Sequence, residues 1–170
     1  MTDRKIDFSR IARNPDLEYE YESRLKVDTI AFNIIHARVS KLYPISSVSV
    51  KRTTDYYVEE DEYRYTTDNN MTFTKIQKKQ IRSVKNKDIK YSLSSEKTEE
   101  TLSMILSEDK RSLLGSTGTV LTVKSIRKKN RIAYPVDNVV IHLTEVRNAD
   151  NVITSLEVEV EANPFKDDFD

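Results

Sequence analysis

Glutamates alternate with apolar or aromatic residues in two segments near opposite ends of the chain. The segments are Leu17-Glu18-Tyr19-Glu20-Tyr21-Glu22-Ser23-Arg24-Leu25 and Ser155-Leu156-Glu157-Val158-Glu159-Val160-Glu161. A period of two places the glutamates of each segment on one face of an extended strand. Carboxylates on alternate residues lie about 7 Å apart. They repel by about 2 kcal/mol at an effective dielectric of ~20, but by only about 0.6 kcal/mol in water. An enclosed glutamate face therefore needs a cation.

Two interpretations of these faces stay open. On a one-sided sheet, the glutamates are simply solvated. If Leu156, Val158 and Val160 pack against other residues, the glutamates face either open water or an internal polar cavity. Because two such strands occur in one chain, we favour the cavity.

Basic residues alternate in a similar way in the middle of the chain. One segment places Lys90, Ser92, Ser94 and Glu96 on a shared face, and another does the same with Arg127, Lys129 and Arg131. Further basic positions are Arg64 and, with mixed parity, Lys75, Lys78, Lys79 and Arg82. A barrel with acidic and basic walls would hold metal ligands opposite phosphate ligands, which suits a polyphosphate. The alternative is a basic surface patch over residues 75–90 that binds nucleic-acid backbone.

The composition narrows the chemistry. The chain has 170 residues, of which 37% are hydrophobic and 33% charged, and its 28 basic residues balance its 28 acidic ones. It has no cysteine, and only His36 and His142 offer imidazole, so a metal would be held by carboxylates, which favours Mg²⁺ or Mn²⁺. Two glycines provide no glycine-rich phosphate loop. No apolar run has the length of a membrane span, and we expect a protein that is neither secreted nor membrane-bound.

The pattern predicts one domain over residues 17–162, after a polar extension over 1–16 and before an acidic tail over 163–170. Strands are predicted at about 17–27, 45–58, 62–67, 71–84, 88–96, 120–134, 139–146 and 155–162, as an antiparallel sandwich or barrel. Asp28 or Thr29 is predicted to cap a helix that runs to about Lys41 and packs on the sheet as a lid or plug. Residues 97–114 are predicted to interrupt the sheet as a helix or excursion.

Taken in order, these segments resemble the metal-dependent RNA 5′-triphosphatases of fungi, protists and large DNA viruses, which belong to the triphosphate tunnel metalloenzyme superfamily. The resemblance spans Leu17 to Glu161. The opening Glu-x-Glu-x-basic motif resembles Glu20-Tyr21-Glu22-Ser23-Arg24, and the closing Glu-x-Glu-x-Glu motif resembles Glu157-Val158-Glu159-Val160-Glu161. Three internal motifs resemble Tyr63-Arg64-Tyr65, Asp88-Ile89-Lys90-Tyr91-Ser92-Leu93-Ser94-Ser95-Glu96 and Lys129-Asn130-Arg131-Ile132-Ala133-Tyr134.

The resemblance implies a mainly β (α+β) fold, an eight-stranded antiparallel β-barrel that forms a triphosphate tunnel with a few packed helices. It implies that Mn²⁺ or Mg²⁺ is held by Glu20, Glu22 and Glu161. The triphosphate would be bound by Arg24, Arg64, Lys78, Lys90, Lys129 and Arg131. The attacking water would be oriented or deprotonated by one of three catalytic carboxylates, Glu96, Glu157 and Glu159. Glu18 is expected outside the site.

The activity implied by the resemblance is a polynucleotide 5′-phosphatase that removes the γ-phosphate of triphosphate-ended RNA in the first step of mRNA capping. Nucleoside triphosphatase activity and a guanylyltransferase partner, on the same or a separate chain, are also implied. One alternative is a tunnel-fold tripolyphosphatase or thiamine triphosphatase, and another is a non-catalytic RNA-binding capping subunit. The expected location is intracellular, whether in cytoplasm, virus factory, virion or nucleus. The composition, rich in asparagine and lysine, is compatible with a viral protein or a plasmid-encoded one, and a cellular origin stays open.

Two positions depart from the family pattern. The penultimate strand has Ile141-His142-Leu143-Thr144 where the family has an aspartate in the second position. His142 either points into the tunnel or lies on the surface, and both possibilities stay open. In the lysine-rich strand, Lys75 and Lys79 compete with Lys78 for the position inside the tunnel.

Overall fold

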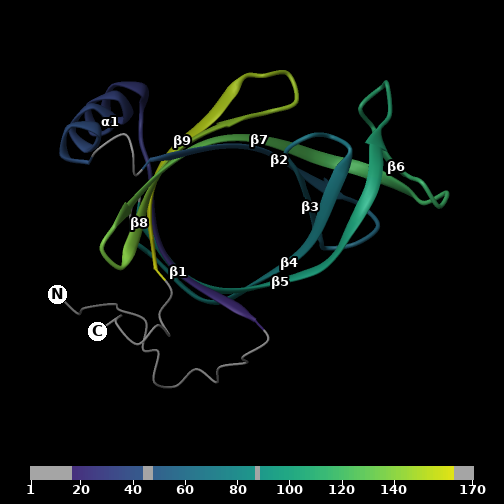
Figure 1. The fold of residues 1–170 in the computed structure, drawn as a ribbon, viewed down its shortest axis with the longest axis horizontal. Helices are drawn as coiled ribbons and strands as arrows, with labels where there is room; N and C mark the ends of the chain where they lie inside the picture. Colours follow the sequence, from purple (N-terminus) through teal and green to yellow (C-terminus); the bar gives the residue numbers. More distant parts are fainter. Residues whose placement is uncertain (1–16, 44–47, 87–88, 163–170) are drawn as a thin grey trace.

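The computed structural model describes residues 17–43, 48–86 and 89–162 (Figure 1). The expected extension over 1–16, the expected tail over 163–170 and Asp88 lie outside the described residues. The described residues form one helix and nine strands: β1 (Glu18–Lys26), α1 (Thr29–Leu42), β2 (Ser49–Val58), β3 (Arg64–Thr67), β4 (Thr72–Asn86), β5 (Ile89–Leu106), β6 (Ser112–Gly115), β7 (Val120–Val136), β8 (Val139–Arg147) and β9 (Ile153–Ala162).

Eight of the strands close into an antiparallel barrel around a central tunnel (Figure 1). Their order is β1-β9-β8-β7-β2-β3-β4-β5, and β5 pairs back onto β1. On β1, Glu18 lies opposite Glu96 of β5, while Glu22 lies opposite Glu161 of β9. The expected eight-stranded antiparallel barrel is therefore confirmed.

The ninth strand, β6, closes a second and smaller ring of strands beside the tunnel. It pairs with the end of β5 and the beginning of β7, so that β2 to β7 enclose an apolar chamber. The chamber is filled by Tyr56, Val58, Tyr65, Phe73, Met104, Leu113 and Leu121. Strand β3 separates the two interiors, because its Tyr65 lies in the chamber while Arg64 and Thr66 line the tunnel.

Two β-bulges allow long strands to serve both interiors. In the β4–β5 pairing, Lys75 lies opposite Glu100 and Ile76 opposite Thr98, which leaves Glu99 as an extra residue on β5. In the β2–β7 pairing, Lys124 is left over in the same way. An extra residue reverses which face the following side chains occupy. Polar side chains of β5 and β7 therefore face the tunnel on one side of the bulge, and apolar ones face the chamber on the other.

Helix α1 begins after Asp28, whose Oδ1 accepts a hydrogen bond from the Ala31 N–H at 2.7 Å. Such an N-cap satisfies a backbone donor that the helix itself leaves free. The predicted helix is confirmed. It lies outside the ring of strands, next to β9, and none of its residues is buried, so the expectation of a lid or plug is wrong (Figure 1). Within the described part of the chain, no helix is long and apolar enough to cross a membrane.

The expected interruption over residues 97–114 is also wrong. Strand β5 continues to Leu106 along its hairpin with β4, and β6 follows at Ser112. The polar run from Lys97 to Thr101 has no apolar alternation, because most of its side chains face solvent beyond the tunnel. The described residues contain one helix where a few packed helices were expected.

Candidate active site

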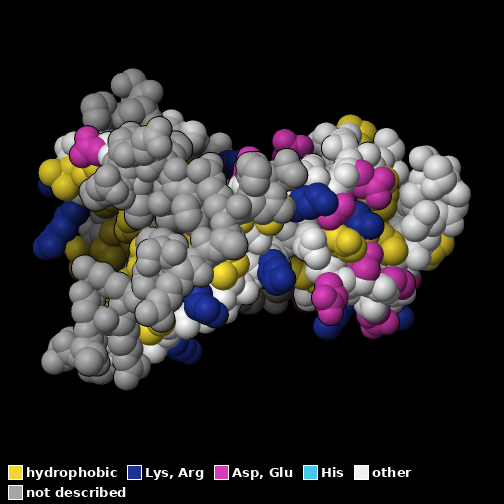
Figure 2. Space-filling model, turned by 90° about the horizontal axis from the view of Figure 1, so that it is seen from below, with side chains coloured by type: hydrophobic (Ala, Val, Ile, Leu, Met, Phe, Trp, Pro, Cys, Tyr) yellow, Lys and Arg dark blue, Asp and Glu magenta, His cyan; other side chains and the backbone are white. Residues whose placement is uncertain are grey.

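The tunnel holds a cavity of about 610 Å³ that is lined almost entirely by polar and charged side chains. Eight basic residues line it: Arg24, Lys51, Arg64, Lys78, Lys90, Arg127, Lys129 and Arg131. Six acidic residues do so as well: Glu18, Glu20, Glu22, Asp55, Glu96 and Glu161. Figure 2 shows that the outer face also carries basic and acidic side chains, scattered among uncharged ones. The alternation seen in the sequence therefore concentrates charge inside the barrel.

Three of these carboxylates form one cluster. Glu20 and Glu22 project from the same face of β1, and Glu161 comes from the neighbouring strand β9. Each offers an oxygen, and these oxygens all lie within 4.8 Å of one another. The structure thus brings together the three residues expected to bind the metal.

The cluster shows the repulsion expected of crowded carboxylates. Burial and the nearby carboxylate of Glu159 raise the pKa of Glu22 to about 8. Burial also raises the pKa of Glu161. Burial acts in the same direction on Glu20, but hydrogen bonding with Glu161 and the charge of Lys78 prevail and lower its pKa to about 2. Without a cation, the cluster therefore retains protons that free glutamates would lose.

This arrangement fits a divalent metal ion. Three carboxylates from two adjacent strands form an all-oxygen donor set of the kind that Mg²⁺ and Mn²⁺ prefer. A bound cation would also favour the charged forms of Glu22 and Glu161, whose pKa values are raised first by burial and then by neighbouring carboxylates. His142 lies inside the tunnel beside this set, with its Nε2 3.2 Å from Oε2 of Glu161. Its Nδ1 is buried and has no hydrogen-bond partner among the described residues.

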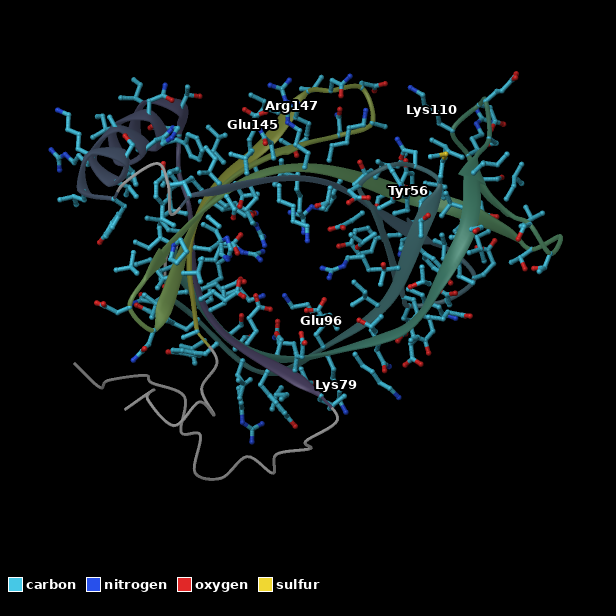
Figure 3. All side chains as sticks on the ribbon, viewed as in Figure 1. Tyr56, Lys79, Glu96, Lys110, Glu145 and Arg147 are labelled. Atoms are coloured by element: carbon cyan, nitrogen blue, oxygen red, sulfur yellow. The ribbon has the colours of Figure 1, made fainter. Side chains whose placement is uncertain are left out.

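Basic side chains from β3, β4 and β5 also line the cavity, and one of them contacts the cluster. The Nζ of Lys78, on β4, lies 3.2 Å from Oε2 of Glu20. Lys90, on β5, donates to Oε1 of Gln80 at 3.1 Å. Arg64 of β3 forms an ion pair with Glu96, in which Nη2 and Oε1 are 2.6 Å apart, and Figure 3 shows Glu96 pointing into the ring.

Lysine 78 is the member of its segment that enters the tunnel. Lys75 lies over the Tyr63 ring, with its Nζ 4.2 Å from the ring centroid, and Figure 3 shows Lys79 on the outside. The alternation of Ile76, Lys78 and Gln80 along the cavity accounts for this choice. Lys75 and Lys79 have the opposite parity and do not border the cavity, and Arg82 follows a second bulge of this pairing, which places it opposite Leu93.

Lysine 129 is held by an aspartate that the sequence pattern did not single out. Its Nζ lies 2.8 Å from Oδ2 of Asp55, whose Oδ1 accepts from the Thr66 hydroxyl at 2.8 Å. Burial lowers the pKa of Lys129 despite this pairing. Burial opposes ionisation of Asp55 as well, but Lys129 and Arg64 lower its pKa. Asp55 adjoins Tyr56 and Tyr57, which made its segment resemble an ordinary core strand.

Two further glutamates lie behind the cavity surface. Glu159 is fully buried, with its oxygens 3.5 Å from Nε of Arg24 and 3.6 Å from Nη2 of Arg131. Glu157 is 2% exposed and lies within 4 Å of both Arg24 and Arg127. Burial would raise the pKa of Glu159, but Arg131 and Arg24 lower it. Of the three carboxylates considered as catalytic, Glu96 alone borders the cavity.

Some residues of the site were missed or misplaced by the sequence analysis. Glu18 borders the cavity although it was expected outside the site. Lys51 was missed, although Ser49, Lys51, Thr53, Asp55 and Tyr57 alternate along β2 and all line the tunnel. Their shared parity was the available signal.

Comparison with solved structures finds RNA triphosphatases with a similar fold. The S. pombe RNA triphosphatase Pct1 matches with a TM-score of 0.63 at 15% identity, over 88% of this chain and 72% of that chain. The Mimivirus capping enzyme triphosphatase matches with a TM-score of 0.57 at 16% identity, over 88% of this chain and 81% of that one. Pct1 in complex with the Spt5 CTD gives 0.62 at 14% identity, over 90% and 73%. No protein-family model and no curated protein sequence matches this chain.

The chain therefore has the tunnel fold of the RNA triphosphatases of mRNA capping. The expected resemblance is confirmed at the level of the fold, with a closed barrel of the same architecture.

Proposed function

We propose that this protein is a metal-dependent RNA 5′-triphosphatase, which removes the γ-phosphate from triphosphate-ended RNA. One observation carries the proposal. A single tunnel, in a fold shared with RNA triphosphatases, is lined both by a cluster of three carboxylates and by eight basic side chains. A triphosphate is the ligand whose charge and length match both halves of this lining.

The carboxylate cluster would hold the metal. Glu20, Glu22 and Glu161 would bind Mn²⁺ or Mg²⁺, and the bound ion would polarise the phosphoryl oxygens and neutralise their charge. His142 would orient Glu161 from behind through its Nε2.

The basic side chains would bind the triphosphate. Arg64, Lys78, Lys90, Lys129, Arg131 and Arg24 border the cavity, where several of them pair with carboxylates of the tunnel. Phosphate oxygens would replace part of these contacts with charge-assisted hydrogen bonds. Glu159 and Glu157 would hold Arg24, Arg127 and Arg131 in position from the buried side, so the role of these two glutamates would be structural.

The remaining step is the attack of water. Glu96 borders the cavity and would orient the water and receive its proton. The water oxygen would form a bond to the γ-phosphorus, and the bond from that phosphorus to the β–γ bridging oxygen would break. Inorganic phosphate and RNA with a 5′-diphosphate would leave. The basic side chains would stabilise the charge of this in-line transition state.

The same tunnel would accept nucleoside triphosphates, since the groups that we assign contact only phosphates and metal. The diphosphate end is the form of RNA that a guanylyltransferase, on this chain or another, would take next in cap synthesis. The proposed place of action is the intracellular compartment where capping occurs.

Release of labelled γ-phosphate from triphosphate-ended RNA tests the proposal. We expect release with Mn²⁺ or Mg²⁺ and none in EDTA. Tripolyphosphate and thiamine triphosphate serve as competing substrates, and higher kcat/KM for either would favour the alternative tunnel enzymes. Tight RNA binding without turnover under all metal conditions would contradict catalysis.

A further inference from the structure

A second cavity, of about 430 Å³, lies on the outside of the barrel wall. It crosses the outer faces of β2, β7 and β8, between the turn after β3 and the hairpin that joins β8 to β9. Figure 3 shows Glu145 and Arg147, which line it, outside the ring. We call this cavity the outer groove.

The outer groove adjoins the tunnel. Thr53 and Lys129 border both spaces, since these two residues form the wall between them. Strand β3 pairs with β2 only from Thr54 to Tyr57, so residues 49–53 of β2 have no neighbouring strand on that side within the described residues. A chain leaving the tunnel over this edge would enter the outer groove.

Four basic residues line the outer groove: Arg52, Lys128, Lys129 and Arg147, of which Lys129 is paired with Asp55. Arg52 is exposed and makes no hydrogen bond or ion pair with any described residue. Lys128 donates to Oδ1 of Asn151 at 3.0 Å, and Arg147 donates to the Asn151 carbonyl at 2.9 Å, so both fix the hairpin over the groove. Of the groove's two carboxylates, Asp68 and Glu145, the second is paired with Arg147 at 2.5 Å. The groove therefore keeps an excess of positive charge.

One polar atom of the groove is not satisfied by the described part of the protein. Oδ1 of Asn130 is buried and has no hydrogen-bond partner in the described structure. Threonine hydroxyls and asparagine amides make up most of the remaining lining. Such groups bind ribose hydroxyls and base edges, while arginine and lysine bind phosphates.

We propose that the outer groove binds the body of an RNA whose 5′ end lies in the tunnel. This inference rests on the proposed function for the identity of the RNA end. Arg52 would contact a phosphodiester, and Asn130 would accept a hydrogen bond from a ribose hydroxyl or a base. An acidic peptide is the competing occupant, and the experiments below distinguish it from RNA.

The affinity for a 20-nucleotide RNA with a 5′-hydroxyl end, measured by fluorescence anisotropy, tests the groove. Because this RNA has no triphosphate, the measurement does not depend on triphosphate binding in the tunnel. We expect Arg52→Glu to weaken binding about 5- to 10-fold at low salt and to reduce the dependence of affinity on salt. The matched control is Lys79→Glu, which makes the same charge change outside another part of the barrel and should alter affinity less than about twofold. Thermal unfolding confirms that both variants are folded.

Two further measurements separate this inference from the proposed function. In the triphosphatase assay, Arg52→Glu should raise KM about fivefold more for a triphosphate-ended 20-mer than for a triphosphate-ended dinucleotide. Cross-links from 4-thiouridine RNA should map to residues 52–54 and 128–130. If the wild type does not hydrolyse triphosphate-ended RNA, the proposed function fails, but the anisotropy measurement still shows whether the groove binds RNA.

The inference is overturned by unchanged RNA affinity in Arg52→Glu, or by an equal loss in Lys79→Glu. It is also overturned if a phosphorylated acidic peptide occupies the groove without displacing RNA.

Discussion

The tunnel and the apolar chamber are built from the same strands but filled in opposite ways. Strand β3 shows the contrast within four residues, since Arg64 and Thr66 face the tunnel while Tyr65 is 2% exposed in the chamber. Phe73 and Leu113 are fully buried in the chamber. Across β3, Asp55 pairs with Lys129, and several other charged groups of the tunnel also form ion pairs.

The energetic consequences of these two interiors differ. A fully buried apolar side chain contributes about 1.5–3 kcal/mol through removal from water. Buried charges lose hydration, and their pairing repays much of that loss without adding much stability. Strands β2 to β7 are therefore held by the chamber, and this support allows them to carry charged residues on the tunnel side. Stability and chemistry are assigned to different faces of the same strands.

The bulge at Glu99 connects the two interiors, and its removal should have the largest effect. Deleting Glu99 would place either the tunnel half or the chamber half of β5 on the wrong face. We expect the deletion variant to lose its cooperative unfolding transition in urea. The control, Glu99→Ala, keeps the residue count and should change the free energy of unfolding by less than about 0.5 kcal/mol. A cooperative transition near that of the wild type in the deletion variant would refute the role of the bulge.

Truncation in the chamber should affect stability far more than the chemistry. Phe73 is fully buried, and its ring lies 5.6 Å from that of Tyr56 in an edge-to-face contact. Phe73→Ala should lower the free energy of unfolding by about 3–5 kcal/mol, measured by urea unfolding. Ile105→Ala, at an exposed position, should lower it by less than about 0.5 kcal/mol. A smaller loss in Phe73→Ala than in Ile105→Ala would argue against the chamber as the stabilising core.

A substitution on the tunnel side should show the reverse. Lys78→Ala should lower kcat/KM for triphosphate-ended RNA about tenfold, because a cation beside Glu20 is lost, and should leave the free energy of unfolding near that of the wild type. Lys79→Ala, one residue away and outside, should change kcat/KM less than about twofold. Equal losses of activity in the two variants would show that the parity of this strand is misassigned.

The smallest expected effect is on the pH dependence of stability in EDTA. The folded protein retains protons on Glu22, whose pKa is raised from 4.5 to about 8, while the unfolded chain releases them. The free energy of unfolding should therefore fall as the pH rises from about 5 to 8, because the unfolded chain has largely released this proton by pH 5 while the folded protein releases it only near pH 8. Urea unfolding at both pH values measures the change, and Glu22→Gln should reduce it. A free energy of unfolding that rises over this interval would contradict the crowding of the cluster.

Much of the tunnel was predictable from the sequence because its strands obey a period of two. That period placed the glutamates of each end segment on one face, and the family resemblance then grouped Glu20, Glu22 and Glu161. The structure places their oxygens within 4.8 Å, although their role as ligands stays a prediction. The chamber was not predictable, because it depends on long-range pairing of a four-residue strand, β6, and on bulges that reverse parity. Periodicity within one segment contains no signal for either.

Asp55 and residues 97–114 show the same limit in detail. The aspartate shares its parity with Ser49, Lys51 and Thr53, but that parity alone does not say which face of β2 is inside, and the register of β2 with β7 sets it opposite Arg127. The segment over 97–106 is a strand because β4 pairs with it, while its own polar composition favours a loop.

The most direct test of the account compares Glu161→Ala with the wild type in the release of γ-phosphate from triphosphate-ended RNA with Mn²⁺. We expect at least about a 100-fold loss, or roughly 3 kcal/mol of transition-state stabilisation, with the free energy of unfolding in EDTA maintained or increased. The control Glu108→Ala, at an exposed position outside the tunnel, should keep activity within about twofold. Wild-type hydrolysis by folded Glu161→Ala protein would contradict the assignment of the carboxylate cluster as the centre of the chemistry.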